Sequence, residues 1–147
     1  GVAWHYVGGK AVGATPNGRK AGEPLNDGSI SPMRRQDKQG PTAVLKSALK
    51  AGWDESVISV LNQKFSAAVM QSPEGQEKLA DLTETFLKNG GQHIQHNLVD
   101  AQTLRDAQNH PENYRDLVVR VAGFSAFFLH LTREIQDDII ARTEQEI

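Results

Sequence analysis

Cysteine is absent from this 147-residue sequence, and its absence excludes several kinds of chemistry. Without thiols the chain forms no disulfide, holds no iron–sulfur cluster through cysteine and generates no thiyl radical of its own. No apolar run is long enough to cross a bilayer, and no stretch has the pattern of a signal peptide. The net charge is −2 and like charges are not grouped in blocks, so neither nucleic acid nor a membrane is an expected partner. We therefore expect a soluble, cytoplasmic protein.

Motifs for phosphate binding and for serine nucleophiles are also absent. Lys10, Arg19 and Lys20 lie among glycines, but the sequence contains neither GxxxxGK[ST] nor a GxGxxG that follows a strand. We interpret these cations as parts of a structural loop. Ser125 is not in the pattern of a nucleophile elbow, and no serine triad can be assembled around it.

Two pairs of ionisable side chains have spacings that argue against a reactive site. His93 and His96 are three residues apart, and on a strand this odd spacing sends them to opposite faces, so no metal site is expected. His93 fits better as a buried, hydrogen-bonding residue. Asp137 and Asp138 are adjacent and diverge by about 100° on a helix, which favours a solvated face or salt bridges over a paired-carboxylate site.

Turn-forming residues dominate the first third of the chain. Gly, Pro, Asn and Asp are frequent there, with turn signals at Asn17-Gly18 and Asp27-Gly28. Apolar residues are too few for this stretch to hold itself together, so we expect residues 1–52 to form an ordered, loop-rich segment that packs on a missing barrel core. A disordered tail is the alternative. Pro41 at a first helical position and Gly52 as a stop predict one short helix.

Residues 53–147 alternate between strand and helix patterns, which on their own predict a mixed α/β domain. Runs of β-branched and aromatic residues indicate strands, while apolar stripes that begin at a capping residue and end at glycine or proline indicate helices. Strands are predicted at 57–65, 93–99 and 117–121, an outgoing segment at 127–131, and helices over 72–90, 100–111 and 132–145. The predicted helix caps are Ser72, Asp100 and Thr132.

A short stretch near the end of this domain has the composition of a glycine turn between two short strands. It reads Arg120-Val121-Ala122-Gly123-Phe124-Ser125-Ala126 and is followed by Phe127-Phe128. It resembles the radical loop of the glycyl radical enzymes, in which one glycine stores an unpaired electron. Other blocks resemble the same family in the same order: 14–25, 40–43, 61–64, 90–100, 104–108, 110–114 and 135–140. The resemblance covers nearly the whole chain.

Glycine suits a stored radical for a physical reason. An α-carbon radical between an amide nitrogen and a carbonyl is delocalised and becomes planar, and glycine flattens without a Cβ that would press on its neighbours. The resemblance assigns the radical to Gly123. The residues that support the loop are then Arg120, Val121, Ala122, Phe124, Ser125 and Ala126. Arg120 either orients the loop by donating to carbonyls or forms a salt bridge. Many family members carry Tyr where this chain has Phe124.

The resemblance implies an α/β fold that is the C-terminal portion of a β/α barrel, with a buried radical loop at 120–128 and a C-terminal helix at 132–145. In the family, the glycyl radical regenerates a thiyl radical on a cysteine, and the thiyl abstracts hydrogen from a small-molecule substrate under anaerobic conditions. This chain has no cysteine, so that residue must lie upstream in the same polypeptide or on a partner subunit. The first residue is Gly1 rather than Met. We expect a cleaved or split portion, inactive alone, of an enzyme that is a homodimer.

No bound cofactor and no metal are expected in this chain. In the family, a separate activating enzyme with an iron–sulfur cluster and S-adenosylmethionine installs the oxygen-sensitive radical, and it must reach the glycine Cα. The loop is mainly apolar, however, and burial of each large apolar side chain contributes roughly 1.5 to 3 kcal/mol. We therefore expect a loop that is buried at rest and swings out for activation.

Within the family, the Gly-Phe-Ser-Ala-Phe-Phe and Gln-Asp-Asp-Ile-Ile stretches most resemble the radical eliminases and dehydratases. These lyases split C–O, C–N or C–S bonds in small molecules. Similar blocks occur in the aryl- and alkylsuccinate synthases, which add hydrocarbons to fumarate. We rank elimination first. Two further alternatives are a stand-alone spare-part subunit that docks onto a damaged enzyme, and a catalytically silent module that recruits the activating enzyme.

Overall fold

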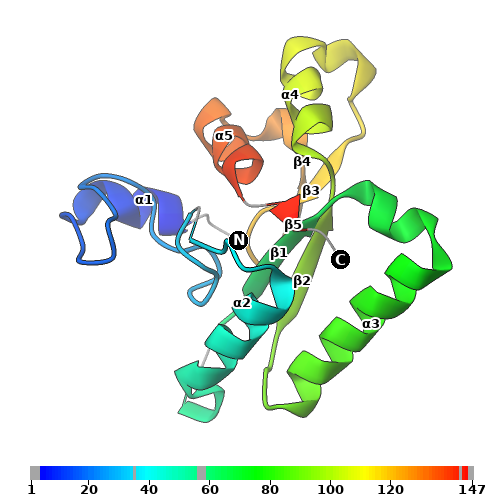
Figure 1. The fold of residues 1–147 in the computed structure, drawn as a ribbon. Helices are drawn as coiled ribbons and strands as arrows, with labels where there is room; N and C mark the ends of the chain where they lie inside the picture. Colours follow the sequence, from blue (N-terminus) through cyan, green and yellow to red (C-terminus); the bar gives the residue numbers. More distant parts are fainter. Residues whose placement is uncertain (1–3, 35, 56–58, 143, 146–147) are drawn as a thin grey trace.

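The computed structural model describes residues 4–34, 36–55, 59–142 and 144–145, which form a mixed α/β fold (Figure 1). The helices are α1 (Trp4–Ala11), α2 (Pro41–Ala48), α3 (Pro73–Lys88), α4 (Ala101–Asn109) and α5 (Arg133–Ala141). The strands are β1 (Leu61–Phe65), β2 (Ile94–Leu98), β3 (Val118–Arg120), β4 (Ser125–Phe127) and β5 (Glu144–Gln145). None of the helices in the described ranges is long and apolar enough to cross a membrane.

Three parallel strands form the central sheet in the order β2-β1-β5. β1 pairs with β2 along its whole length, from Leu61 opposite Ile94 to Phe65 opposite Leu98. α3 connects these two strands, so β1, α3 and β2 form the crossover unit that neighbouring parallel strands require. β3 and β4 form a separate antiparallel pair. We call this pair and its connecting loop the glycine hairpin.

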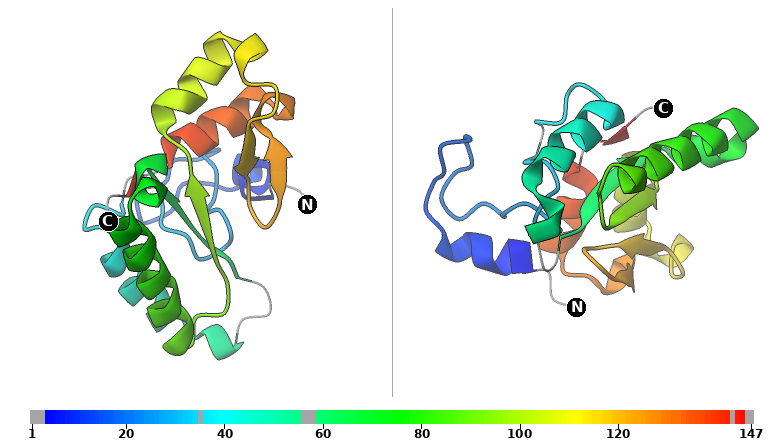
Figure 2. Two further views of the ribbon diagram at one scale, coloured as in Figure 1. Left: turned by 90° about the vertical axis from the view of Figure 1, so that its right-hand side faces the viewer. Right: turned by 90° about the horizontal axis from the view of Figure 1, so that it is seen from below.

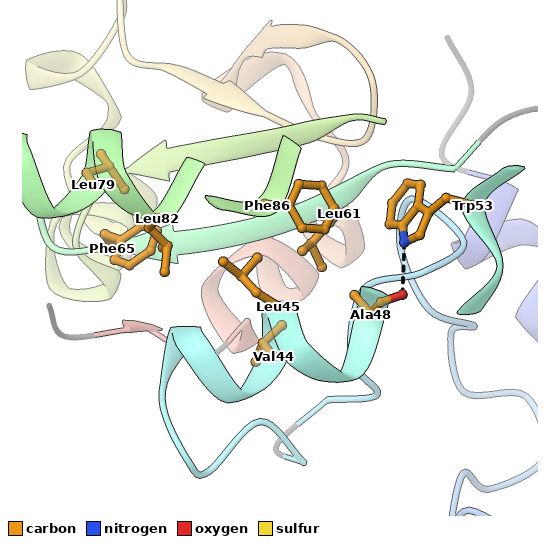
Figure 3. Close-up of a cluster of buried hydrophobic side chains, with 9 residues drawn as sticks. All are labelled: Val44, Leu45, Ala48, Trp53, Leu61, Phe65, Leu79, Leu82 and Phe86. Atoms are coloured by element: carbon orange, nitrogen blue, oxygen red, sulfur yellow. Dashed lines mark hydrogen bonds between the residues drawn. The ribbon is translucent and has the colours of Figure 1, made fainter. Parts of the chain in front are cut away.

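The first hydrophobic core lies between β1, α2 and α3 (Figure 3). Its buried members are Val44, Leu45, Ala48, Trp53, Leu61, Phe65, Leu79, Leu82 and Phe86. The indole of Trp53 meets the Phe86 ring edge to face at 5.2 Å between centroids, and its Nε1 donates to the carbonyl of Ala48 at 2.8 Å. This hydrogen bond satisfies the one polar group that the indole brings into the core.

The second hydrophobic core joins the glycine hairpin to the C-terminal half of the chain. Its buried members are Val99, Leu104, Ala107, Val119, Val121, Phe128 and Ile139. They come from the end of β2, from α4, from the hairpin and its outgoing segment, and from α5. Accordingly, α4, α5 and the hairpin gather at one end of the molecule, and α2 and α3 lie at the other (Figure 2).

The longest helix, α3, begins and ends where the local sequence predicts. Ser72 is its N-cap, and the Ser72 Oγ accepts a hydrogen bond from the Gly75 amide at 3.0 Å, while Pro73 occupies the first helical turn. Gly90 has a φ of +94°, which only glycine adopts without strain, and ends the helix. Asp100 and Thr132 also occupy N-cap positions, but neither side chain makes the capping hydrogen bond.

The structure differs from the sequence prediction at both ends of the chain. A helix, α1, replaces the first part of the predicted loop. The C-terminal helix ends at Ala141 rather than at 145, and Glu144–Gln145 form β5 instead, paired with β1. The predicted strand at 57–65 is described only from 59 onward, because residues 56–58 lie outside the described ranges, and it forms a ladder over Leu61–Phe65.

A buried arginine organises the loop that follows α1. The guanidinium of Arg19 donates to the carbonyls of Val12, Gly13, Lys20 and Glu23, at 2.6 Å in the case of Glu23. Five N–H groups in a rigid fork suit this task, since each backbone carbonyl of a tight loop needs a donor. Arg19 is thus part of a structural loop, as predicted, whereas Lys10, predicted to lie in the same loop, is in α1.

Candidate functional site

Gly123 lies in the two-residue loop at the tip of the glycine hairpin. β3 and β4 pair at three positions that end with Arg120 opposite Ser125, and beyond them the Val121 amide donates to the Phe124 carbonyl at 2.9 Å. The loop is therefore Ala122-Gly123. Gly123 has a φ of +76°, whereas Ala122 is not among the described residues with positive φ. This combination is typical of a type II turn, which requires glycine at its third position.

The α-carbon of Gly123 is open to its surroundings in this chain. Gly123 is exposed, and a Cβ built on it would meet no atom of the described residues within 4 Å. It lies on the wall of a groove of about 640 Å³, whose other walls come from α1, the loop around Arg19 and the segment 25–29. The backbone conformation therefore selects glycine here, and steric crowding within this chain does not.

The glycine hairpin is only half covered. Val119, Val121 and Phe128 are buried in the second core, whereas Val118 and Phe127 are 51% and 43% exposed. These two residues pair across the hairpin, so they present one apolar face to solvent. The prediction of a buried loop is thus wrong for these 147 residues taken alone, because one side of the hairpin and its tip have no covering partner among the described residues.

The remaining predicted loop residues have different surroundings. Ala122, Phe124 and Ala126 are half-buried, and Ser125 is exposed. The Nη1 of Arg120 donates to Ser125 Oγ at 3.0 Å, across the hairpin. Neither of the two expectations for Arg120 is met in the described residues, because its side chain contacts a hydroxyl and not a loop carbonyl or a carboxylate.

One face of the central sheet is made of buried polar side chains. Side chains alternate along a strand, so Asn62 and Lys64 of β1 point away from the first core, and their partners in the β1–β2 register are Gln95 and Asn97. All four side chains are buried. We call these four residues the polar face. Buried polar groups need partners, and each of these supplies a hydrogen bond to a segment from elsewhere in the chain.

Two residues of the polar face, Gln95 and Asn97, hold the glycine hairpin. Gln95 Oε1 accepts a hydrogen bond from the amide of Gly123 at 3.3 Å. Asn97 makes two bonds to the backbone of Arg120: its Nδ2 donates to the carbonyl and its Oδ1 accepts from the amide, both at 2.8 Å. The hairpin is therefore fixed to β2 at its tip and at Arg120, the last residue of β3.

The other two residues of the polar face hold the N-terminal loop and the end of α5. The side-chain Nδ2 of Asn62 donates to Asp27 Oδ2 at 2.7 Å, and the backbone amide of Asn62 donates to Ser31 Oγ at 2.9 Å. Lys64 Nζ donates to the carbonyl of Ile140 at 3.2 Å, at the end of α5. Burial lowers the pKa of Lys64. The carboxylate of Glu144, 3.9 Å from Lys64 Nζ, partly offsets this decrease.

A buried charge cluster beside the polar face ties α1 to α5. Asp138 accepts from His5 at 3.1 Å, from Arg142 at 3.2 Å and from Arg34. Asp27 lies 3.8 Å from Arg142, so two carboxylates already balance two guanidinium groups. A charged imidazole would be in excess, and burial together with the field of Arg142 lowers the pKa of His5 from 6.5 to about 4. His5 is therefore neutral at pH 7 and donates through Nε2. The salt-bridge interpretation of Asp138 is confirmed.

The two histidines of the predicted strand differ in burial, and the prediction for His93 is wrong. His93 is exposed, which contradicts its predicted burial, although its Nε2 lies 3.1 Å from Gln95 Nε2. His96 is the partly buried one; it contacts Thr83 Oγ1 at 2.9 Å, and burial lowers its pKa. They lie on opposite sides of β2, and no group of three potential metal ligands occurs in the described part of the chain.

Sequence reasoning missed the residues that support the loop from outside it. Gln95, Asn97 and Arg142 all contact the hairpin backbone, yet none was singled out. A signal existed in β2, which reads Ile94-Gln95-His96-Asn97-Leu98. Amides at alternate positions of a buried parallel strand interrupt the usual apolar run, and such interruptions mark a face with polar partners.

Comparisons with known proteins agree on one family. The family model described as "Glycine radical" matches residues 26–129. The chain is 46% identical, over 99% of its length, to the glycyl radical subunit of 4-hydroxyphenylacetate decarboxylase from Clostridioides difficile, and 50% identical, over 89%, to a probable dehydratase of Escherichia coli. It spans 16% of each of these relatives. Among solved structures, the B12-independent glycerol dehydratase from Clostridium butyricum, in its glycerol-bound form, matches 98% of the chain with a TM-score of 0.92 and 43% identity, over 18% of that chain.

The matched region contains the glycine hairpin, the polar face and most of both hydrophobic cores. The resemblance first found in the Arg120–Ala126 stretch is thus confirmed by a family model that covers most of the chain and by relatives with more than 40% identity. On these grounds the chain belongs to the glycyl radical enzyme family.

Proposed function

We propose that this chain stores an organic radical on the α-carbon of Gly123 and supplies it to a catalytic cysteine outside these 147 residues. The observation that carries the proposal is the placement of Gly123 at the tip of the hairpin, with a positive φ, an open α-carbon and an amide held by Gln95. The glycyl radical is a protein-derived cofactor, so the chain itself needs no bound group to carry it.

The chemistry is a series of hydrogen-atom transfers. A radical of a separate activating enzyme, of the iron–sulfur and S-adenosylmethionine class, removes one hydrogen atom from Gly123 Cα and leaves the glycyl radical. This radical takes the hydrogen atom of a cysteine thiol, which restores the glycine and leaves a thiyl radical. The thiyl takes a hydrogen atom from the substrate and returns it to the product radical. Gly123 then gives its hydrogen atom back to the thiyl, so the radical is stored again.

We infer that the complete protein cleaves a bond in a small molecule. The relatives are named as a decarboxylase and as dehydratases, and such names support bond cleavage over the addition of hydrocarbons to fumarate. Elimination of a C–O, C–N or C–S substituent remains our first candidate. Decarboxylation, which breaks a C–C bond, joins it because a decarboxylase subunit is 46% identical to this chain.

The partner that completes the site is, in our proposal, a cysteine-containing β/α barrel to which this chain contributes its last elements. The exposed apolar face of Val118 and Phe127 supports this proposal, because a contact with the barrel would remove it from water. The same contact would bring Gly123 near the cysteine and shield the radical from oxygen. A homodimer of the complete enzyme is part of the proposal.

Electron paramagnetic resonance of the activated complete enzyme tests the proposal. We expect a doublet, since the one hydrogen left on Gly123 Cα splits the signal of the unpaired electron. Gly123→Ala should remove both the doublet and turnover. Gly22→Ala is the matched control, because Gly22 has nearly the same φ, +79°, and equally open space, so it suffers the same backbone strain without touching the hairpin.

Two outcomes would contradict the proposal. An unchanged doublet in Gly123→Ala would assign the radical to another residue. Loss of the signal in Gly22→Ala as well would mean that strain at any such glycine disables the protein, and the effect at Gly123 would then carry no chemical meaning.

A further inference from the structure

The carboxamide of Gln95 is buried, 6% of the residue being exposed, and both of its ends have a defined partner. Its nitrogen can only donate, and it lies 3.1 Å from His93 Nε2. His93 Nε2 must therefore be the acceptor of this hydrogen bond. This contact fixes the orientation of the amide, so that the oxygen of Gln95 faces the Gly123 amide at 3.3 Å.

Asn97 repeats this arrangement two residues further along β2. Residues two apart on a strand share a face, and Asn97 holds both backbone polar groups of Arg120 at 2.8 Å. Its side chain thus acts as a substitute for a neighbouring strand. The carbonyl of Arg120 also accepts from Arg142 Nη1 at 3.3 Å. β2 therefore contacts the hairpin through hydrogen bonds from side chains to backbone.

We propose that Gln95 is a positioning residue for the radical glycine. This proposal rests on the proposed function of Gly123. The Gln95 oxygen keeps the Gly123 peptide plane in one orientation and favours the docked position of the hairpin, in which Gly123 can exchange hydrogen atoms with the thiol. By accepting from the amide, it also increases electron donation from the nitrogen into the half-filled orbital on Cα. Asn97 anchors the strand that carries this tip.

This mode of attachment suits a hairpin that must separate from β2 and return. The net gain of a hydrogen bond between protein groups is small because water replaces it when the two groups separate, and each such bond shifts the equilibrium by roughly two- to tenfold. Three bonds from Gln95 and Asn97 can then favour the docked hairpin without locking it there. Val119, Val121 and Phe128, which are buried in the second core, add an apolar contribution to the same docked position.

The first test needs no radical and uses the complete, unactivated enzyme. Amide hydrogen exchange of the peptide 120–128 should be roughly threefold faster, or more, in Gln95→Leu, which has no acceptor for the Gly123 amide. Gln95→Glu keeps an acceptor oxygen and should exchange like the parent. Gln63→Leu is the matched control, since Gln63 is also a buried sheet glutamine but donates to the carbonyl of Pro41 on the other face. If Gln95→Leu does not fold, Gln95→Asn, whose side chain is one methylene shorter and places its oxygen further from the Gly123 amide, should show the same acceleration of exchange.

The second test uses the activated enzyme. Gln95→Leu should still give the glycyl doublet, but with an altered coupling to the exchangeable amide proton, and turnover per radical should fall roughly threefold or more while KM for substrate stays unchanged. Exchange and turnover per radical equal to those of the parent would overturn the positioning role. A parent enzyme without a doublet would instead refute the proposed function, and the exchange measurement would still decide the role of Gln95.

Discussion

At Gly123, the backbone dihedral and the space around the α-carbon set different limits on a replacement. The φ of +76° disfavours any residue with a Cβ, although a Cβ would find open space among the described residues. Gly91 shows the opposite situation: a Cβ there would lie 2.4 to 2.6 Å from three carbons of the Phe86 ring in the first core, and its φ is not in the positive range. Glycine is thus required at one position by conformation and at the other by packing.

These two positions predict different losses of stability. Gly123→Ala should lower the local free energy of unfolding by about 1 to 2 kcal/mol, the cost of a left-handed L-residue. Gly91→Ala should cost more, about 3 kcal/mol, because either the Phe86 ring or the end of α3 must move. Native-state hydrogen exchange in the hairpin and in α3 measures both values. A larger loss at Gly123 than at Gly91 would mean that the tip is more crowded than the structure shows.

At the scale of helices and strands, local sequence signals were sufficient where neighbours in the chain decide the structure. Ser72, Pro73 and Gly90 act within α3, and its bounds were predicted almost to the residue. α1 and β5 were missed because their partners are far away in the sequence. His5 of α1 contacts Asp138, 133 positions later, and β5 forms only by pairing with Lys64 and Phe65 of β1. The candidate site was predicted from Gly123, whereas Gln95 and Asn97 became recognisable only once β2 lay beside the hairpin.

The charge cluster predicts a pH-dependent attachment of α1. The pKa of His5 falls from 6.5 to about 4 on folding, so between these values the unfolded state binds a proton that the folded state does not. Stability is therefore complete above pH 6.5 and decreases as the pH falls towards 4, by at most roughly 3 kcal/mol. Hydrogen exchange of residues 4–11, corrected for the intrinsic effect of pH, should accelerate over this window.

His5→Gln provides the control for this prediction. The glutamine amide can still donate to Asp138 but does not titrate, so exchange of α1 should become independent of pH between 6.5 and 4. The same acceleration in His5→Gln as in the parent would show that another group is responsible.

The molecule as a whole is two hydrophobic cores joined by a sheet that packs on the first core with one side and carries the polar face on the other. The polar face contacts the N-terminal loop, the end of α5 and the glycine hairpin through hydrogen bonds. Among the apolar side chains left in water, Trp4 lines the groove at the tip of the hairpin, and Val118 and Phe127 belong to the hairpin itself. This distribution fits a chain that forms part of a larger site.

Two properties of the 147-residue chain alone follow from this organisation. It should turn over no substrate after activation, since it contains no thiol to convert the glycyl radical into a thiyl radical. Addition of the cysteine-containing remainder should restore turnover and should slow amide exchange in residues 118–128, because contact with the barrel raises the opening free energy of the hairpin. Activity assays and exchange with and without the remainder measure both effects. Turnover by the isolated chain would refute the thiyl mechanism.

Oxygen provides the most direct measurement of where the radical is stored. Dioxygen adds to a carbon-centred radical, and the peroxyl radical that forms at a backbone α-carbon leads to scission of the chain at that residue. After activation and brief exposure to air, mass spectrometry of the denatured protein should find one new pair of fragments, divided at Gly123, in amounts that match the radical content before exposure. Gly123→Ala, treated in the same way, should remain intact. Cleavage at any other residue, or an activated protein that air leaves whole, would contradict the assignment of the radical to Gly123.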